Sequence, residues 1–294
     1  MSTPLHLRDA HVVIVGMGLM GASLGYDLRG YCRKVTGIVR RPEAIDSTLA
    51  SGCVDDVTMD IRAAISVADV VVLATPVRTI LRQINDLGPL MKPGCVLLDM
   101  GSTKERICQA MDNLPEDIQP VGGHPMCGKE KAGIEAAEPG LYYGCTFVLC
   151  PLPRTSDQAL ALIHEMVAHI HAHPMLLEPQ RHDRLVAAIS HLPYLGASAL
   201  VWHVMNVAAS DPLVWEVAAT GFRDSTRVAA SDVQMLLDIL LTNRESVLEA
   251  VDNYINLLAS FQDALLQNNE ENLAKQLEGI AKARRNWMLG AKTH

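Results

Sequence analysis

The stretch VVIVGMGLMG, Val12 to Gly21, decides the fold expected for this chain. Residues 12–15 are a continuous β-branched run, which is typical of a strand buried on both faces of a parallel sheet. Gly16, Gly18 and Gly21 then fit the pattern GxGxxG, between that strand and a helical segment. In this context the first glycine makes a tight turn, the second lets the backbone approach a pyrophosphate, and the third packs helix on strand. The pattern predicts a dinucleotide-binding loop; the alternative is a glycine-rich turn with no ligand.

Strand and helix signals alternate through the front half of the chain. Further strands are expected at 35–39, 69–73, 95–99, 119–122 and 145–150, with helices near 42–51 and 77–90. Such alternation predicts a doubly wound parallel sheet with helices on both faces. From about Glu178 only helical patterns remain. We therefore expect an α/β fold, with a Rossmann-type dinucleotide-binding domain over residues 1–177 and an all-α substrate and dimerisation domain over 178–294.

Composition limits the classes of function. With 294 residues, 49% of them hydrophobic and 20% charged, the chain suits two globular domains. A net charge of −8 and the lack of a basic run argue against nucleic-acid binding. Seven cysteines without a CxxC pair indicate small buried residues in a reducing compartment. No signal peptide and no apolar stretch near membrane-spanning length are expected, so we predict a cytoplasmic protein without a membrane partner.

Three polar segments follow strands, where ligands of doubly wound sheets bind. They are Ala74-Thr75-Pro76, DMGSTK (99–104) with Ser102, and GGHPMCGKEKAG (122–133) with His124. Pro125 restricts His124 to an extended conformation beside flexible glycines. An imidazole held there is suited to accept a proton, since its ordinary pKa lies near neutrality. The alternative is a turn histidine that only happens to precede proline.

The end of the second strand indicates which cofactor is bound. An NAD site usually carries an acidic residue about 20 positions beyond the glycines, whereas this chain has Arg40 and Arg41. Two guanidiniums suit a 2′-phosphate, so we predict NADP over NAD; the alternative is a pair of solvated arginines. The other cofactor-binding candidates lie at the helix start and after the strand at 69–73: Leu19, Met20, Thr75 and Pro76.

The helical half supplies two candidate substrate-binding residues. His191 interrupts an apolar run. Pro193 leaves a backbone carbonyl about one turn earlier without its hydrogen bond and can kink the helix near His191. The alternative for His191 is a hydrogen-bonded core histidine. Arg227, in GFRDSTR, is suited to clamp a carboxylate; the alternative is a salt bridge to Asp224 or Asp232.

A heptad-type seam in the last third predicts a homodimer through the C-terminal helices. Its positions are Val247, Val251, Tyr254, Leu258, Phe261 and Leu265. The alternative is packing within one chain. No metal site is expected at the histidines 164, 169, 171 and 173, since no carboxylate or cysteine converges on them in sequence. Cys127 is interpreted as a small residue that fills a turn.

Six motifs in order make the chain resemble the prephenate/arogenate dehydrogenase (cyclohexadienyl dehydrogenase) family of tyrosine biosynthesis. They are GMGLMGASL, ATP, DMGSTK, GGHPMCGKEKAG, HD with ISHLPY, and GFRDSTR, and they span most of the chain. The resemblance implies that His124 is the catalytic base and that Ser102 assists it at the substrate hydroxyl. It also implies that Glu130, His191 and Arg227 line or gate the substrate site, with the arginine on a substrate carboxylate.

The implied reaction is the NADP-dependent oxidative decarboxylation of a cyclohexadienol. Arogenate would give tyrosine and prephenate would give 4-hydroxyphenylpyruvate, and any tyrosine inhibition is expected at the active site itself. Two alternatives stay open. A β-hydroxyacid dehydrogenase would use a helical lysine, and none lies between 178 and 242. A non-catalytic, NADP-sensing dimeric binding protein would not need Ser102, His124 and Arg227 together.

Overall fold

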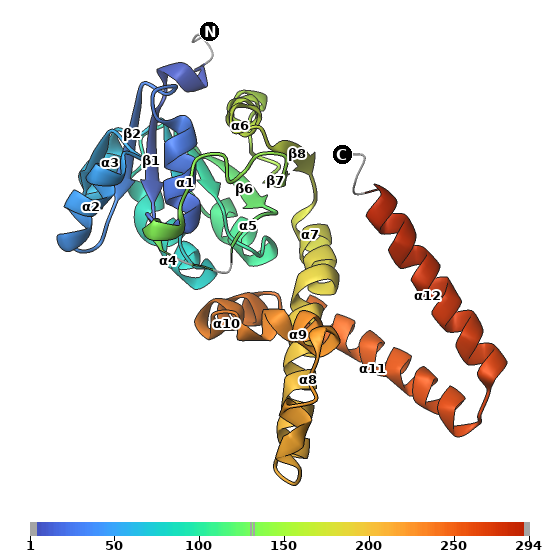
Figure 1. Cartoon of the computed structure of the whole chain (residues 1–294). Helices are drawn as coiled ribbons and strands as arrows, with labels where there is room; N and C mark the ends of the chain where they lie inside the picture. Colours follow the sequence, from blue (N-terminus) through green and yellow to red (C-terminus); the bar gives the residue numbers. More distant parts are fainter. Residues whose placement is uncertain (1–4, 130, 132, 291–294) are drawn as a thin grey trace. The chain divides into compact units, whose positions relative to one another are not determined.

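An eight-stranded, mostly parallel sheet forms the first part of the molecule (Figure 1). The structure is a computed structural model that describes residues 5–129, 131 and 133–290. The strand order is β3-β2-β1-β4-β5-β6-β7-β8. The strands are His11–Val15 (β1), Lys34–Ile38 (β2), Asp56–Thr58 (β3), Val70–Leu73 (β4), Val96–Asp99 (β5), Gln119–Pro125 (β6), Thr146–Pro151 (β7) and His173–Leu176 (β8).

Burial on both faces explains the apolar strands at the centre of the sheet. Every residue of β1, HVVIV, and of β4, VVVL, is buried. β1 pairs in parallel with β2 on one side and with β4 on the other. The direction of winding therefore reverses between β1 and β4, which is where doubly wound sheets open a crevice for ligands.

Helices cover both faces of this sheet. Those of the first part are Leu19–Leu28 (α1), Glu43–Ser51 (α2), Ile61–Ser66 (α3), Val77–Leu87 (α4), Glu105–Asp112 (α5) and Asp157–His169 (α6). Leu24 of α1 and Ile163 of α6 belong to one apolar core. Ile65 of α3, Ile84 of α4 and Met111 of α5 belong to a second core.

The sheet differs from the sequence-based prediction at its β6–β8 edge. β7 runs antiparallel to β6, and β8 then pairs in parallel with β7. The described part of the connection 126–145 contains only the 3-10 turn Ile134–Ala136 (η3). An antiparallel return needs no crossover helix, whereas a parallel one does. The strands β3 and β8 were not predicted, because β3 has only three residues and the exposed β8, HPML, lacks the buried β-branched run of the central strands.

The back half is helical, as predicted. Its helices are Pro179–Val186 (α7), Leu192–Ala208 (α8), Thr220–Thr226 (α9), Val233–Thr242 (α10), Arg244–Leu266 (α11) and Glu270–Gly290 (α12). The single helix expected after residue 233 is interrupted at Asn243. The chain divides into two compact units, Met1–Arg244 and Glu245–His294. The domain boundary expected between residues 177 and 178 stays a prediction.

One helical run corrects the expectation about membrane-spanning length. Residues Pro179–Ala208 form 30 consecutive helical residues, and an 18-residue window there has a mean hydropathy of 1.5. By length and composition alone this run is long enough to cross a bilayer, so the expectation was wrong. A π-helical turn, Ala187–His191, lies inside the run. It ends just before Pro193, at the position where the proline was expected to distort the helix.

Candidate active site

The carboxyl edge of the sheet gathers the segments expected to form the site. Gly16 follows β1, Thr75 follows β4, Ser102 follows β5, and His124 lies near the end of β6. These strands are parallel neighbours, so their carboxyl ends meet at one edge. The sheet topology therefore brings the three polar segments to the same edge as the glycine loop, as predicted.

The glycine loop has the geometry that a dinucleotide requires. Gly16 has a φ of +107°, and a Cβ there would stand 2.7 Å from the carbonyl oxygen of Ala74. A Cβ on Gly21 would stand 2.0 Å from the carbonyl oxygen of Gly16. Gly18, by contrast, faces open space and caps α1 without a side-chain hydrogen bond. The backbone can therefore be approached closely at Gly18, where the first N–H groups of α1 would attract a pyrophosphate.

Arg40 and Arg41 are exposed immediately beyond β2. They precede α2 at the same edge of the sheet as the glycine loop, since β1 and β2 run in parallel. Residues 38–42 contain no acidic side chain. This end of the strand therefore offers positive charge where a 2′-phosphate would lie.

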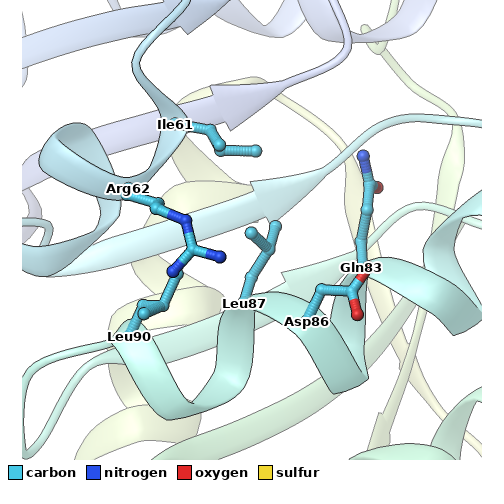
Figure 2. A pocket seen from close by; sticks show the side chains of 6 residues that line it. All are labelled: Ile61, Arg62, Gln83, Asp86, Leu87 and Leu90. Atoms are coloured by element: carbon cyan, nitrogen blue, oxygen red, sulfur yellow. The ribbon is translucent and has the colours of Figure 1, made fainter.

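A pocket of about 510 Å³ lies between α3 and α4 (Figure 2). It is lined by Ile61, Arg62, Gln83, Asp86, Leu87 and Leu90. Gln83 connects it to the site, because its Oε1 accepts a hydrogen bond of 2.7 Å from Thr75 Oγ1.

His124 belongs to a chain of three hydrogen-bonded side chains. Its Nδ1 lies 2.8 Å from Nε2 of His182, and Nδ1 of His182 lies 2.7 Å from Oδ1 of Asp183. His182 and Asp183 are both buried in α7. A carboxylate only accepts hydrogen bonds, so Nδ1 of His182 carries the proton and its Nε2 accepts. Nδ1 of His124 then donates, which leaves a lone pair on its Nε2.

Burial keeps His124 in the form that accepts a proton. It lowers the pKa of this imidazole well below its ordinary value, and the nearby His182 ring, Lys104 ammonium and His191 ring lower the pKa further. The ring is therefore neutral at physiological pH, as a general base must be. Asp183 is placed to stabilise the positive charge that a transferred proton would bring into the chain.

Buried hydrogen bonds fix Asp183 to the loop before α5. Its Oδ1 and Oδ2 accept from the backbone N–H groups of Lys104 and Glu105, at 2.7 and 2.9 Å. The Lys104 ammonium forms a fully buried ion pair with Asp99. Asp99 also accepts from the N–H of Gly123, at 3.0 Å. One network thus joins the DMGSTK loop, the histidine strand and α7.

Ser102 lies within this fixed loop and is half-buried. The N–H of Gly101 before it bonds Oδ2 of Asp99 at 2.8 Å. The hydroxyl of Thr103 after it lies 3.0 Å from that of Thr242. The backbone of Ser102 is therefore held on both sides at the edge that carries His124.

His191 is buried and hydrogen-bonded. It is 2% exposed, and its Nδ1 lies 3.2 Å from Nδ2 of Asn243, which also donates to the carbonyl of Asp183 at 2.7 Å. Burial lowers the pKa of His191 to about 4. This matches the core-histidine alternative; a substrate contact stays a prediction. The side chain of Asn243 turns inward to make these bonds, which explains the break between α10 and α11.

The remaining substrate candidates come from the helical part and the histidine loop. Arg227 is exposed and begins the 3-10 turn Arg227–Ala230 (η6), which packs against α8. Asp224 pairs with Arg223 at 3.4 Å, and Asp232 caps α10. The clamp role of Arg227 stays a prediction. Glu130 lies outside the described residues.

Several residues of this network are not among the candidates predicted from the sequence. They are Asp99, Lys104, His182, Asp183 and Asn243. The HD pair before an apolar helix was quoted as a motif, and the acid and lysine that flank Ser102 were visible in DMGSTK. Among the described residues, no group of three or more His, Cys, Asp or Glu side chains is arranged to hold a metal ion.

Comparison with known protein families places both parts of the chain. Residues 24–176 match the family described as prephenate dehydrogenase, nucleotide-binding domain. Residues 178–279 match prephenate dehydrogenase, dimerization domain. The prephenate dehydrogenase of Bacillus subtilis (strain 168) is 32% identical over 89% of this chain and 72% of its own length. The cyclohexadienyl dehydrogenase of Zymomonas mobilis is 32% identical over 93% of this chain and 94% of its own.

Solved structures give the same picture. The prephenate dehydrogenase from A. aeolicus, in complex with hydroxyphenyl propionate and NAD+, has a TM-score of 0.88 at 31% identity, over 94% of this chain and 98% of its own. The arogenate dehydrogenase of Synechocystis has a TM-score of 0.82 at 26% identity, over 94% and 99%. A 3-hydroxyisobutyrate dehydrogenase from Salmonella typhimurium has a TM-score of 0.57 at 18% identity, over 84% of this chain and 88% of its own. It is similar in fold alone.

Proposed function

The chain belongs to the prephenate dehydrogenase family, and from that premise we propose that it is an NADP-preferring enzyme with His124 as its catalytic base. As a nicotinamide-dependent prephenate/arogenate dehydrogenase, it converts a cyclohexadienol by oxidation and loss of carbon dioxide. The observation that carries the proposal is the chain from His124 through His182 to Asp183, beside the open glycine loop. The weaker likeness to a 3-hydroxyisobutyrate dehydrogenase gives no support to the β-hydroxyacid alternative.

The mechanism assigns each proton to an atom. Nε2 of His124 accepts the proton of the substrate hydroxyl, and the charge spreads along hydrogen bonds to Asp183. A bound nicotinamide would supply the acceptor for the hydride that leaves the ring carbon bearing this hydroxyl. The dienone that results is a vinylogous β-keto acid, and loss of its carboxylate makes the ring aromatic. In this proposal Ser102 orients the hydroxyl, Arg227 binds a substrate carboxylate and His191 lines the site; the same role for Glu130, outside the described residues, rests on the family resemblance alone.

Steady-state kinetics can test the proposed preference for NADP over NAD. Arg40 and Arg41 favour NADP, since guanidiniums bind a 2′-phosphate by charge and by paired hydrogen bonds. Changing both arginines to Ala should lower kcat/KM for NADP by about 10- to 100-fold, or ~1.4–2.8 kcal/mol, and leave NAD turnover nearly unchanged. Arg33→Ala, at the opposite end of β2, is the matched control. Equal kcat/KM for NAD and NADP in the parent protein would refute the preference.

The substrate side chain is keto in prephenate and amino in arogenate. We propose arogenate as the better substrate, by analogy with members of the family whose cofactor site binds NADP. Supplying each acid with NADP and following reduced nicotinamide gives two values of kcat/KM. A higher value for prephenate would reverse the assignment, and no reduction with either acid would refute the activity.

Two further parts of the proposal concern assembly. A homodimer through the C-terminal helices is supported by the dimerization-domain match over 178–279 and by exposed apolar side chains such as Trp202, which is 68% exposed. A second copy of this chain, rather than lipid, would then cover the apolar run 179–208.

The proposal also includes a domain boundary at 177/178 and a cytoplasmic location. The seven free thiols suit a reducing compartment.

A further inference from the structure

Two cysteines face each other at the end of the β6–β7 ladder. Pro125 lies opposite Phe147, and the N–H of Met126 bonds the carbonyl of Thr146 at 2.8 Å. Continued two residues beyond this last ladder pair, the same antiparallel register would set Cys127 opposite Cys145. Because the preceding pair is hydrogen-bonded, this pair occupies a non-hydrogen-bonded position, where Cα atoms of opposite residues are about 4.5 Å apart. That separation lies within the range that a disulfide requires.

The chemistry of the two thiols differs from that of the other cysteines. A hydrogen bond joins the two side chains; it lowers the pKa of Cys145 and raises that of Cys127. Cys145 is therefore the sulfur that reacts first as a thiolate. Burial raises the pKa of Cys32, Cys95 and Cys150 to about 12, which keeps these thiols unreactive. Cys127 and Cys145 are only half-buried.

We propose that Cys127 and Cys145 form a redox modification site, which a hydroperoxide converts to a disulfide. The Cys145 thiolate attacks the peroxide oxygen, which breaks the O–O bond, releases an alcohol or water and leaves a sulfenic acid. The Cys127 sulfur then attacks the Cys145 sulfur, forms the S–S bond and expels water. In sum, two thiols are oxidised and one peroxide is reduced. A reducing thiol reverses the step.

The bond would connect two functional parts of the fold. Cys127 lies three residues beyond His124, and η3, between Cys127 and Cys145 in sequence, contacts α1. Near its end, the buried Tyr142 donates a hydrogen bond of 2.5 Å to the carbonyl of Met20, in the first turn of α1. Oxidation would therefore close this segment into a covalent loop between the histidine strand and the cofactor helix. The thiol chemistry itself does not depend on the proposed activity.

Peptide mapping of the full-length protein tests the site. Reduced protein is treated with a small excess of hydrogen peroxide, denatured, alkylated and digested with trypsin without reduction. Two of the seven cysteines should escape alkylation. The peptides 107–129 and 132–154 should be linked, and a reducing thiol should separate them. Each peptide contains a second cysteine, Cys108 or Cys150, so variants must decide which sulfurs are joined.

Matched alanine variants make the assignment. The link should persist in Cys108→Ala and in Cys150→Ala, and it should vanish in Cys127→Ala and in Cys145→Ala. A link that survives in Cys127→Ala overturns the proposal. So does oxidation of either thiol to a sulfinic acid without a link, or alkylation of all seven cysteines after peroxide treatment.

Discussion

At the scale of single residues, the proposed base depends on a partner far away in sequence. His124 meets His182 across 58 positions, and Asp183 orients that partner. The sequence could indicate His124, because a proline and glycines surround it. It could not pair His124 with His182, since only the docking of α7 beside β6 brings the two rings together. Tertiary contacts of this kind leave no local pattern.

Removal of the base should slow turnover and spare binding. General-base loss typically costs about 10²- to 10⁴-fold in rate, so His124→Asn should lower kcat by that factor with a modest change in KM. The exposed His6 provides the control, since His6→Asn should keep wild-type kinetics. Steady-state assays with prephenate or arogenate, whichever is the better substrate, measure both kcat and KM. Near-wild-type kcat in His124→Asn would show that another group takes the proton.

Acid should destabilise the protein through its buried histidines. Burial lowers the pKa of His191 to about 4, so between its ordinary pKa and this value the unfolded chain binds the proton more strongly. The free energy of unfolding should therefore fall as the pH falls from about 6.5 to about 4, by up to about 1.4 kcal/mol per pH unit for this one group. His124 acts in the same direction.

Urea unfolding across this range of pH measures the effect. His191→Gln keeps an acceptor for Asn243 but cannot be protonated, so its stability should depend less steeply on pH than that of the wild type. Identical slopes for the two proteins would mean that His191 does not contribute.

At the scale of elements, substitutions at two glycines of one loop should have different effects, one on cofactor binding and the other on stability. Gly18 faces open space with a φ of −91°, so Gly18→Ala should fold normally. Its methyl group would obstruct the pyrophosphate and raise the cofactor KM by about tenfold or more, or at least ~1.4 kcal/mol. Gly21→Ala places a Cβ 2.0 Å from the carbonyl of Gly16. This overpacking should cost about 1–3 kcal/mol of stability. Thermal unfolding together with cofactor titration would distinguish the two; equal losses of stability would contradict the assignment.

Local pattern predicted most elements, and the exceptions have physical causes. The β-branched runs of β1 and β4 were evident because both faces are buried. The antiparallel direction of β7 was not evident from local pattern. It follows from the lack of a crossover helix in the described part of 126–145. The helix break at Asn243 was also missed. It comes from hydrogen bonds to His191 and the Asp183 backbone, which a helical pattern does not reveal.

At the scale of the whole molecule, the C-terminal helices carry large apolar side chains that a single chain leaves exposed. On α11, Leu258 is 50% exposed and Leu265 62% exposed, although both belong to the heptad seam. On α8, Trp202 and Met205 are 68% and 56% exposed. Apolar patches of this kind on a monomer mark interaction sites. The seam was predicted from spacing alone, and its exposure within one chain supports the dimer proposal.

Charges placed in the seam should dissociate the dimer. Burying a leucine contributes about 1.5–3 kcal/mol, and each substitution occurs in both copies. Leu258→Glu with Leu265→Glu should therefore weaken association by at least about 100-fold. Light scattering should then change from twice 32.0 kDa to 32.0 kDa at micromolar concentration. Asn256→Glu, on the opposite side of α11, should remain dimeric, because it adds charge outside the seam. A wild-type mass of 32.0 kDa, or a double variant that keeps the larger mass, would refute pairing through this helix.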